Sequence, residues 1–182
     1  MKTLIAVDPG ASGAIAWLPQ GGTPAVENMP ETRGDAIALL RQIAEPGAVA
    51  YIEKINGWIP DGGAAQMFEF GKNVERVGCI LETLGVRLIE VSPKDWQKAL
   101  SLGGTGKQKV PSPPRGLDKA AKKAWRVEHA DEIRAIKAKN GAIVRDWKNK
   151  LKAEAQRRFP GLTVTLKNAD ALLLLEYARI QP

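Results

Sequence analysis

Three carboxylates stand at positions where a fold could bring them together. Asp8 follows the short apolar segment Thr3–Val7, and Glu53 follows the apolar segment Ala48–Ile52. If these segments are parallel neighbouring strands, both side chains project from the same edge of a sheet. Asp170 lies in the first turn of an otherwise apolar helical segment near the end of the chain. These three residues are therefore the first candidates for a chemical site.

Crowded carboxylates repel one another and raise each other's pKa. A divalent cation removes that repulsion, and oxygen-only ligands favour Mg²⁺ or Mn²⁺ over zinc. Metal ions held in this way activate a water molecule and stabilise the leaving oxygen of a phosphodiester. Each carboxylate also has a simpler interpretation, because a strand-end Asp is often a turn former and a helix-start Asp often only balances the helix dipole. The metal interpretation depends on the three lying together.

The elements that must position these residues begin with a run of strands and then alternate. Short apolar segments bounded by turn signals predict strands at Thr3–Val7, Ala14–Leu18, Ala25–Met29, Ala48–Ile52 and Val86–Val91. Helical spacing predicts helices over Asp35–Ala44 and Gly63–Leu84, and Ser92 before Pro93 predicts the N-cap of a short third helix. Three successive strands followed by alternation indicate an α/β fold, with a five-stranded mixed sheet flanked by helices.

The regular pattern breaks after residue 100. A Gly-rich and then Pro-rich connector leads into two expected helices, Asp118–Asn140 and Ile143–Phe159. A brief β-like segment, Leu162–Leu166, and a closing apolar helix, Asn168–Ile180, complete the chain. We interpret the 182 residues as a single domain with a basic helical insertion at about 104–146.

The positive charge is concentrated in that insertion. The whole chain carries 27 Lys and Arg against 20 Asp and Glu, a formal net charge of +7. Residues 107–150 alone hold 13 Lys and Arg against 5 Asp and Glu, so this segment has a net charge of +8. A near-neutral core with a basic insert is typical of nucleic-acid binders, although a solubilising surface helix has the same composition.

Single cysteine and histidine residues exclude several classes of site. Cys79 alone forms no intramolecular disulfide and no Cys-rich zinc site, and we expect it to pack in its helix. His129 would have to serve any Ser-His-Asp or Cys-His centre, and nothing around it resembles one, so we expect a solvent-facing or capping residue. No apolar run suits a signal peptide or a membrane span, which predicts a cytoplasmic protein without a membrane partner.

Three motifs in order resemble those of RuvC-type Holliday junction resolvases. Val7–Gly13, with the sequence VDPGASG, is similar to the opening motif of that family. Tyr51–Glu53 is similar to its second acidic strand, and Asn168–Leu172, with an Ala-Asp-Ala core, to its C-terminal acidic helix. The likeness is greatest to the small RuvC-like nucleases of bacteriophages and prophages. It covers roughly Thr3–Leu100 and Trp147–Arg179.

The resemblance implies an RNase H-like fold and a two-metal nuclease site. It assigns Asp8, Glu53 and Asp170 as ligands of Mg²⁺, with Mn²⁺ as a substitute. It also implies a homodimer, with the helix Gly63–Leu84 as the dimer element, acting on branched DNA such as a four-way junction in the cytoplasm of a bacterium or an infected host, without a nucleotide cofactor.

The chain departs from the family pattern at Lys167. The family usually has a fourth acidic or histidine ligand three residues before the last Asp, and a lysine cannot ligate a metal ion. One interpretation is that the second metal binds weakly; our hypothesis is that the Lys167 ammonium replaces some of the missing positive charge at the scissile phosphate. The family's catalytic basic residue is matched best by Lys148, or by Lys150, although either could be a solvated helix residue.

Further residues are candidates for DNA contacts. The loop that begins at Lys54 contains Trp58, whose ring could stack on unpaired bases or pack back on its own domain. Lys107 and Lys109 in the basic insertion, and Lys150 at the end of the basic segment 107–150, are expected near phosphates. If about half of the cations there neutralise phosphates, binding falls steeply with salt.

Three other functions compete with a DNA junction resolvase. The Asp-Pro-Gly motif also resembles the phosphate loop of sugar kinases and actin-like ATPases, but those enzymes need two such lobes and this chain has room for one. A non-catalytic junction-binding protein would explain Lys167. A RuvC-like nuclease acting on structured RNA would keep the same motifs.

Overall fold

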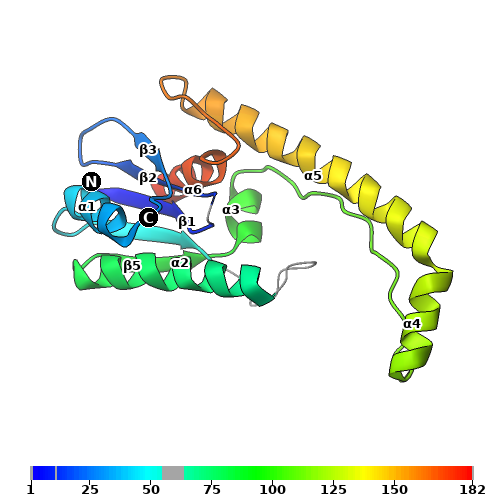
Figure 1. The fold of residues 1–182 in the computed structure, drawn as a ribbon. Helices are drawn as coiled ribbons and strands as arrows, with labels where there is room; N and C mark the ends of the chain where they lie inside the picture. The colour runs from blue at the N-terminus through cyan, green and yellow to red at the C-terminus, as the bar shows by residue number, and fades with distance from the viewer. Residues whose placement is uncertain (1, 11, 55–63, 182) are drawn as a thin grey trace. The chain divides into compact units, whose positions relative to one another are not determined.

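Five strands form one mixed sheet in the order β3-β2-β1-β4-β5. The computed structural model describes residues 2–10, 12–54 and 64–181 (Figure 1). Its strands are β1 (Leu4–Asp8), β2 (Ala14–Leu18), β3 (Ala25–Asn28), β4 (Val49–Glu53) and β5 (Arg87–Val91). The first three are antiparallel neighbours, whereas β4 runs parallel to β1 and β5 parallel to β4. The predicted five-stranded mixed sheet is confirmed.

Helices α1 and α2 cover one face of this sheet. Side chains alternate between the two faces of a strand, and Ile5, Val7, Ala50 and Ile52 belong to one buried cluster with side chains of α1 (Arg33–Ile43) and α2 (Ala64–Thr83). Thr32 caps α1 by accepting a hydrogen bond from the amide of Asp35, at 3.1 Å.

The opposite face is covered by α6 (Ala169–Arg179), which packs on β1, β2 and β4. Four consecutive leucines, Leu172–Leu175, are buried in this helix. The rings of Tyr51 on β4 and Tyr177 on α6 meet edge to face at 6.1 Å, which identifies Tyr51 as a residue of the α6 face. By the same alternation Glu53, two residues further along β4, points to that face.

Helix α3 (Pro93–Ala99) follows β5 and has the predicted cap. The Ser92 hydroxyl accepts a hydrogen bond from the Asp95 amide at 3.3 Å, and Pro93 begins the helix. The Trp96 side chain is almost completely buried. This short helix therefore has a fixed start and one deep anchor.

Residues Gly104–Lys150 form a second compact unit, separate from the unit made by residues 1–103 and 151–182. It contains α4 (Lys119–Glu128) and most of α5 (Ala130–Arg158), and we describe it by itself. The Asn140 side chain holds the backbone of Gln108 at both groups, accepting from its amide at 2.8 Å and donating to its carbonyl at 2.9 Å. This pair fixes the extended segment before α4 against α5.

Two expectations for the helices were wrong, one in α5 and one in α2. Helix α5 continues through Asn140 and Gly141, and the break between helices lies instead at His129, the C-cap of α4. Glycine costs an internal helical position only about 1 kcal/mol, so surrounding turns can override it. Cys79, expected to pack, is exposed.

The segment Leu162–Leu166 is not a strand. Its backbone groups form hydrogen bonds with side chains instead of with a neighbouring strand. The Gln156 amide donates to the carbonyls of Phe159 and Leu162 at 3.3 and 2.9 Å and accepts from the amide of Val164 at 3.3 Å.

No helix of the described residues is long and apolar enough to cross a membrane.

Candidate functional site

Asp8 and Glu53 end two adjacent parallel strands. The register pairs Val7 of β1 with Ile52 of β4, so the two acidic residues come next at the same edge of the sheet. Both alternate away from the α1 and α2 face, toward the face that α6 covers. Asp170 lies in the first turn of α6. The parity of both strands and the start of α6 thus bring all three predicted carboxylates to one region.

The protonation of Glu53 reports this proximity. The pKa of the Glu53 carboxyl is raised from its ordinary 4.5 to about 8. Burial is the largest cause, and the negative charges of Asp8 and Asp170 add to it. A hydrogen bond from Trp96 acts in the opposite direction. The three carboxylates are therefore close enough for Asp8 and Asp170 to disfavour the charged form of Glu53.

Trp96 is a residue of this site that the sequence did not reveal. Its indole Nε1 donates a hydrogen bond to Oε1 of Glu53 at 3.1 Å, and its ring is 1% exposed. This hydrogen bond fixes one carboxylate oxygen of Glu53. The only sequence signal was the well-capped short helix that carries it.

The turn after β1 is shaped by glycine. The Gly10 amide donates to Oδ1 of Asp8 at 3.1 Å, and the Gly13 amide donates to the Gly10 carbonyl at 2.9 Å. A Cβ atom at Gly13 would lie 2.2 Å from the backbone oxygen of Asp8 and 2.8 Å from its Cγ. Position 13 therefore has no room for a side chain while Asp8 keeps this orientation.

A second turn fixes the start of α6. The buried Asn168 side chain accepts a hydrogen bond from the Thr165 amide at 2.7 Å and donates to the Thr163 carbonyl at 3.2 Å. The Thr165 hydroxyl accepts from the backbone amides of Lys167 and Asn168. These bonds hold the chain immediately before Asp170, so Asn168 positions that carboxylate through the backbone.

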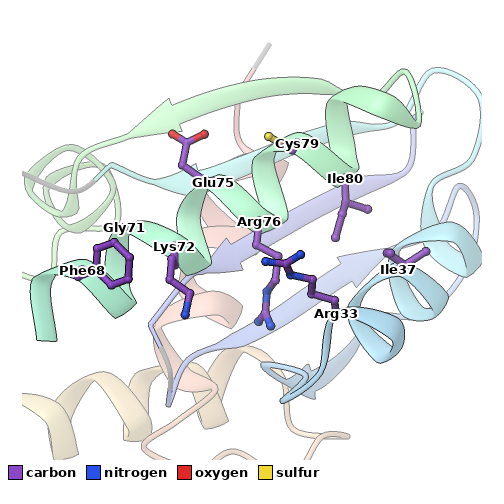
Figure 2. A pocket seen from close by; sticks show the side chains of 9 residues that line it. All are labelled: Arg33, Ile37, Phe68, Gly71, Lys72, Glu75, Arg76, Cys79 and Ile80. Atoms are coloured by element: carbon purple, nitrogen blue, oxygen red, sulfur yellow. The ribbon is translucent and has the colours of Figure 1, made fainter. Parts of the chain in front are cut away.

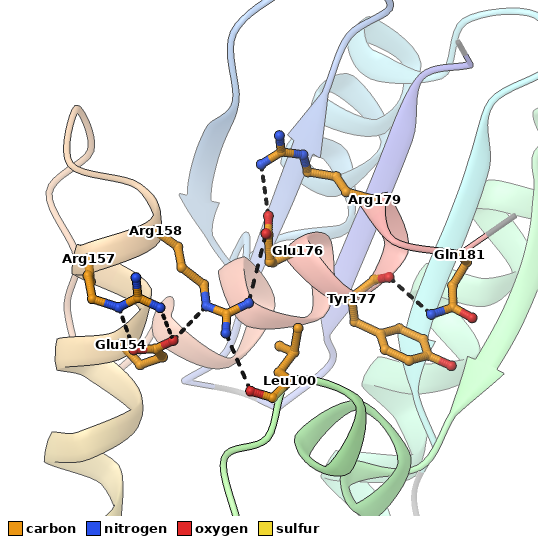
Figure 3. A network of polar contacts seen from close by, with 8 residues as sticks. All are labelled: Leu100, Glu154, Arg157, Arg158, Glu176, Tyr177, Arg179 and Gln181. Atoms are coloured by element: carbon orange, nitrogen blue, oxygen red, sulfur yellow. Dashed lines mark hydrogen bonds and ion pairs between the residues drawn. The ribbon is translucent and has the colours of Figure 1, made fainter.

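Arg158, at the end of α5, joins the elements that carry the site (Figure 3). Its guanidinium pairs with Glu154 at 2.7 Å and with Glu176 of α6 at 3.8 Å, and it donates to the carbonyl of Leu100, the C-cap of α3, at 3.4 Å. All three charged side chains are about four-fifths covered. One largely buried cation thus connects the helix that bears Trp96 with the helix that bears Asp170.

The other predicted site residues lie at varied places. Lys167 is exposed, and its ammonium forms no ion pair with a described residue. Lys54 pairs with Glu90 across the ends of β4 and β5 at 3.3 Å, with both side chains 56% exposed. Trp58 lies outside the described residues.

The cations of the insertion are all on the surface of the second unit. Lys107 and Lys109 lie in its extended segment, and Lys148 and Lys150 lie inside α5. Lys148 and Lys150, the candidates for the family's catalytic basic residue, thus lie within a helix, as expected, and that role stays a prediction.

A groove of about 620 Å³ lies between α1 and α2, and none of the three carboxylates lines it (Figure 2). The Arg76 guanidinium donates there to the carbonyls of Pro30 and Glu31 at 3.0 and 3.4 Å, tying α2 to the chain before α1. Phe68 is 67% exposed on α2, with the Lys72 ammonium 5.6 Å from its ring centre. This groove is a second surface feature, distinct from the candidate site.

The donor set at the sheet edge fits a hard divalent cation. Three carboxylates supply oxygen ligands only, and a cation would offset the repulsion that raises the pKa of Glu53. Among the described residues no three His, Cys, Asp or Glu side chains are arranged to hold a metal ion as they stand. The chemistry of the donors fits the ion, and the side chains would have to draw together around it.

Comparisons with known proteins bear on the fold. No protein-family model and no curated protein matches the sequence. The solved structure of Thermus thermophilus RuvC matches with a TM-score of 0.53 at 13% identity, covering 98% of this chain and 96% of that chain. The chain has a RuvC-like fold.

A second structure, T. thermophilus RuvC in complex with Holliday junction substrate, matches with a TM-score of 0.40 at 12% identity. It covers 72% of this chain and 96% of that chain. At these identities the likeness concerns the arrangement of strands and helices, so what the site does rests on the residues described above.

Proposed function

We propose that this chain is a metal-dependent, structure-selective endonuclease that hydrolyses phosphodiester bonds in four-way or otherwise branched DNA. The observation that carries the proposal is the effect of Asp8 and of Asp170 on Glu53, at the edge of a RuvC-like sheet where β1 and β4 end. The order and sequence of the three motifs, which resemble those of junction resolvases, favour branched DNA over other phosphodiesters.

In this proposal each site residue has a distinct task. Asp8, Glu53 and Asp170 hold Mg²⁺, or Mn²⁺ in its place, with two ions per site as the family resemblance implies. The bound ions supply water activation and neutralise charge developing on the phosphate. Trp96 holds Glu53 through one oxygen, and Asn168 holds the backbone that presents Asp170. Lys167, exposed beside the start of α6, is available to a bound phosphate.

Symmetric cutting of a four-way junction needs two sites, so the proposal includes a homodimer formed through α2. The apolar lining of the groove between α1 and α2 and the exposed ring of Phe68 support this surface. Light scattering of the purified protein tests it: a strictly monomeric protein that still cuts junctions symmetrically would contradict the dimer.

The proposed activity is tested on a synthetic four-way junction with Mg²⁺ or Mn²⁺. Asp8→Asn, Glu53→Gln and Asp170→Asn should each lower the cleavage rate by about a hundredfold or more, because each removes a ligand charge. Junction affinity should remain. Asp35→Asn, an exposed position in the first turn of α1, is the matched control and should cleave like the wild type.

Two other outcomes would change the function. A wild-type protein that binds the junction and never cuts it with either metal is a non-catalytic junction-binding protein. Faster metal-dependent cutting of a structured RNA than of four-way junctions or flaps would make RNA the substrate. Lys167→Ala with unchanged cleavage would remove the role given to Lys167.

A further inference from the structure

Four cations occupy one side of α4 in the insertion unit. Lys119, Lys122, Lys123 and Arg126 follow the spacing i, i+3, i+4 and i+7, which places them within an arc of about 100° and along about 10 Å of helix. All four are exposed. No ion pair joins any of them to a residue that the structure describes. This arc, the cationic side of α4, is a continuous basic stripe.

The stripe destabilises the helix that carries it. Lys119 neighbours Lys122 and Lys123 one turn away, and Arg126 neighbours the same two residues from the other end. Like charges at these spacings repel and weaken a helix. The helix is held instead by its ends, where Asp118 accepts from the Ala121 amide at 2.7 Å and the His129 amide donates to the Trp125 carbonyl at 3.1 Å. A polyanion along the stripe would relieve this repulsion.

The cationic side carries no aromatic or amide side chain. Trp125 lies outside this arc, about 60° round the helix from Lys122. It is half-buried, with its ring stacked on His129 at 3.9 Å between centroids. The His129 ring also lies 2.9 Å, Nδ1 to oxygen, from the Trp125 carbonyl. Because single-stranded nucleic acids are bound largely by stacking on exposed aromatic rings, this surface suits a phosphate backbone better than unpaired bases. Lysines that contact phosphates position a duplex without reading its sequence.

The adjoining part of α5 also carries cations along one side, of which Arg134 pairs with Asp131 at 3.4 Å. Arg134, Lys137, Arg145 and Lys148 share one side of that helix, at i, i+3, i+11 and i+14. Asn140 is on a different side, where it holds Gln108. The side chain that joins the two segments of the unit is therefore not one of these cations.

We propose that the cationic side of α4 binds the phosphate backbone of duplex DNA without sequence preference. The choice of DNA rests on the proposed function, since the arms of a branched substrate are duplexes. The contact adds a grip on the substrate that the metal site does not provide.

The test compares the full-length wild type with the quadruple variant Lys119→Gln, Lys122→Gln, Lys123→Gln and Arg126→Gln. Binding to a fluorescent duplex without a junction is measured by anisotropy over a range of salt concentrations, without divalent metal. The plot of log affinity against log salt concentration has a negative slope, and each lost phosphate contact reduces its steepness by about 0.9. The quadruple variant should therefore have a slope that is less steep by about 2 to 4. Affinity at low salt should fall at least about tenfold.

A charge-matched control removes four exposed cations of the other unit, through Lys2→Gln, Arg41→Gln, Arg87→Gln and Lys152→Gln. It should keep the wild-type slope. Circular dichroism checks that both variants retain their helices. An unchanged slope in the α4 variant, or an equal decrease in the control, would overturn the proposal. So would α4-dependent binding to phosphatidylglycerol vesicles without binding to the duplex.

The Asp8→Asn variant separates this inference from the proposed function. If wild type and Asp8→Asn bind the duplex with the same α4-dependent slope and neither cuts a junction, the DNA grip stands and the nuclease proposal fails. If the wild type cuts junctions while the α4 variant keeps full duplex affinity, the nuclease proposal stands and the DNA grip fails.

Discussion

At the scale of single residues, burial beside two other carboxylates determines the protonation of Glu53. Its pKa near 8 means that the folded, metal-free protein keeps a proton that the unfolded chain releases near 4.5. Between these values the folded state binds more protons, so the free energy of unfolding falls as pH rises. Without a bound cation, ionisation of the buried Glu53 carboxyl lowers the stability of the folded protein. A cation bound beside it would stabilise the charged form and offset that loss.

We therefore predict that the metal-free protein loses stability as pH rises from about 4.5 to about 8. Urea unfolding followed at several pH values measures this loss. Glu53→Gln cannot ionise, and it should flatten the profile in that window. Saturating Mg²⁺ should restore at pH 8 the stability that the metal-free wild type has lost, because the ion binds the folded state.

Glu154 provides a contrast of opposite sign. Its hydrogen bond with Arg157, followed by that with Arg158, lowers the pKa of its carboxyl to about 2 against the opposing effect of burial. Its contribution to stability is present above its ordinary pKa and is lost as pH falls through about 2. Glu154→Gln should change the acid limb and leave the slope between 4.5 and 8 intact; a flattened slope there would contradict the assignment to Glu53.

Gly13 is the second residue with a sharp expectation. An added methyl would meet the Asp8 carbonyl oxygen at 2.2 Å, so Gly13→Ala must displace the β1 turn and with it the Asp8 carboxylate. We predict a loss of stability of about 1–3 kcal/mol and a larger proportional loss of metal-dependent cleavage. Gly34→Ala is the control, because its nearest atom, the Thr32 hydroxyl, is 3.7 Å away. Equal activity in the two variants would contradict this account of the turn.

The sequence pointed to Asp8, Glu53 and Asp170 because each follows or opens a regular element. The strand face on which Asp8 and Glu53 lie, and the place of Asp170 in its helix, follow from the local spacing of apolar residues in the sequence. Trp96 and Asn168 were not found, since their partners lie 43 residues away or in the preceding turn's backbone. Neither a hydrogen bond between distant elements nor one from a side chain to the preceding turn changes the apolar periodicity of the chain.

At the scale of elements, α3, α5 and α6 are held together by one arginine. Arg158 is 18% exposed and serves two carboxylates and the carbonyl of Leu100 at once. Arg157 shares the Glu154 partner but is 69% exposed. The two neighbours thus offer a matched pair: both contact Glu154, whereas Arg158 is more buried and also contacts Glu176 and Leu100.

Arg158→Gln should therefore destabilise the protein by about 1–3 kcal/mol, because Glu154 and Glu176 lose a partly buried partner. Arg157→Gln should cost less than about 1 kcal/mol, as expected for an exposed pair. Chemical denaturation of both variants measures the difference. Similar losses in the two variants would show that Arg158 is not a structural link between these helices.

The elements that were predicted well are those with a complete local signal. The strands and α1, α2, α3 and α6 agree within about two residues, because capping residues and apolar spacing coincide. The segment Leu162–Leu166 has β-like residues but lies against side-chain amides that satisfy its backbone. Propensity alone could not show that no strand would pair with it.

At the scale of the whole molecule, charge and burial divide the chain in the same way. Residues 104–150 carry 13 Lys and Arg against 5 Asp and Glu, a net charge of +8, which exceeds the +7 of the whole protein. None of the buried hydrophobic residues among those described belongs to this unit. The unit that contains the three carboxylates therefore needs no residue of the insertion for its core.

Replacing residues 104–150 by a flexible Gly-Ser linker should accordingly leave the carboxylate site assembled. Leu151, Ala155 and Phe159 remain to cover the core, and Arg158 keeps its partners. We predict a cooperative thermal transition close to that of the wild type, and Mg²⁺-dependent cutting of junctions at saturating protein and low salt. Duplex affinity and its salt slope should fall together. The deletion protein carrying Asp8→Asn controls for contaminating nuclease. Loss of the cooperative transition would show that the insertion is part of the folding unit, and unchanged affinity would show that its charge has no role in holding DNA.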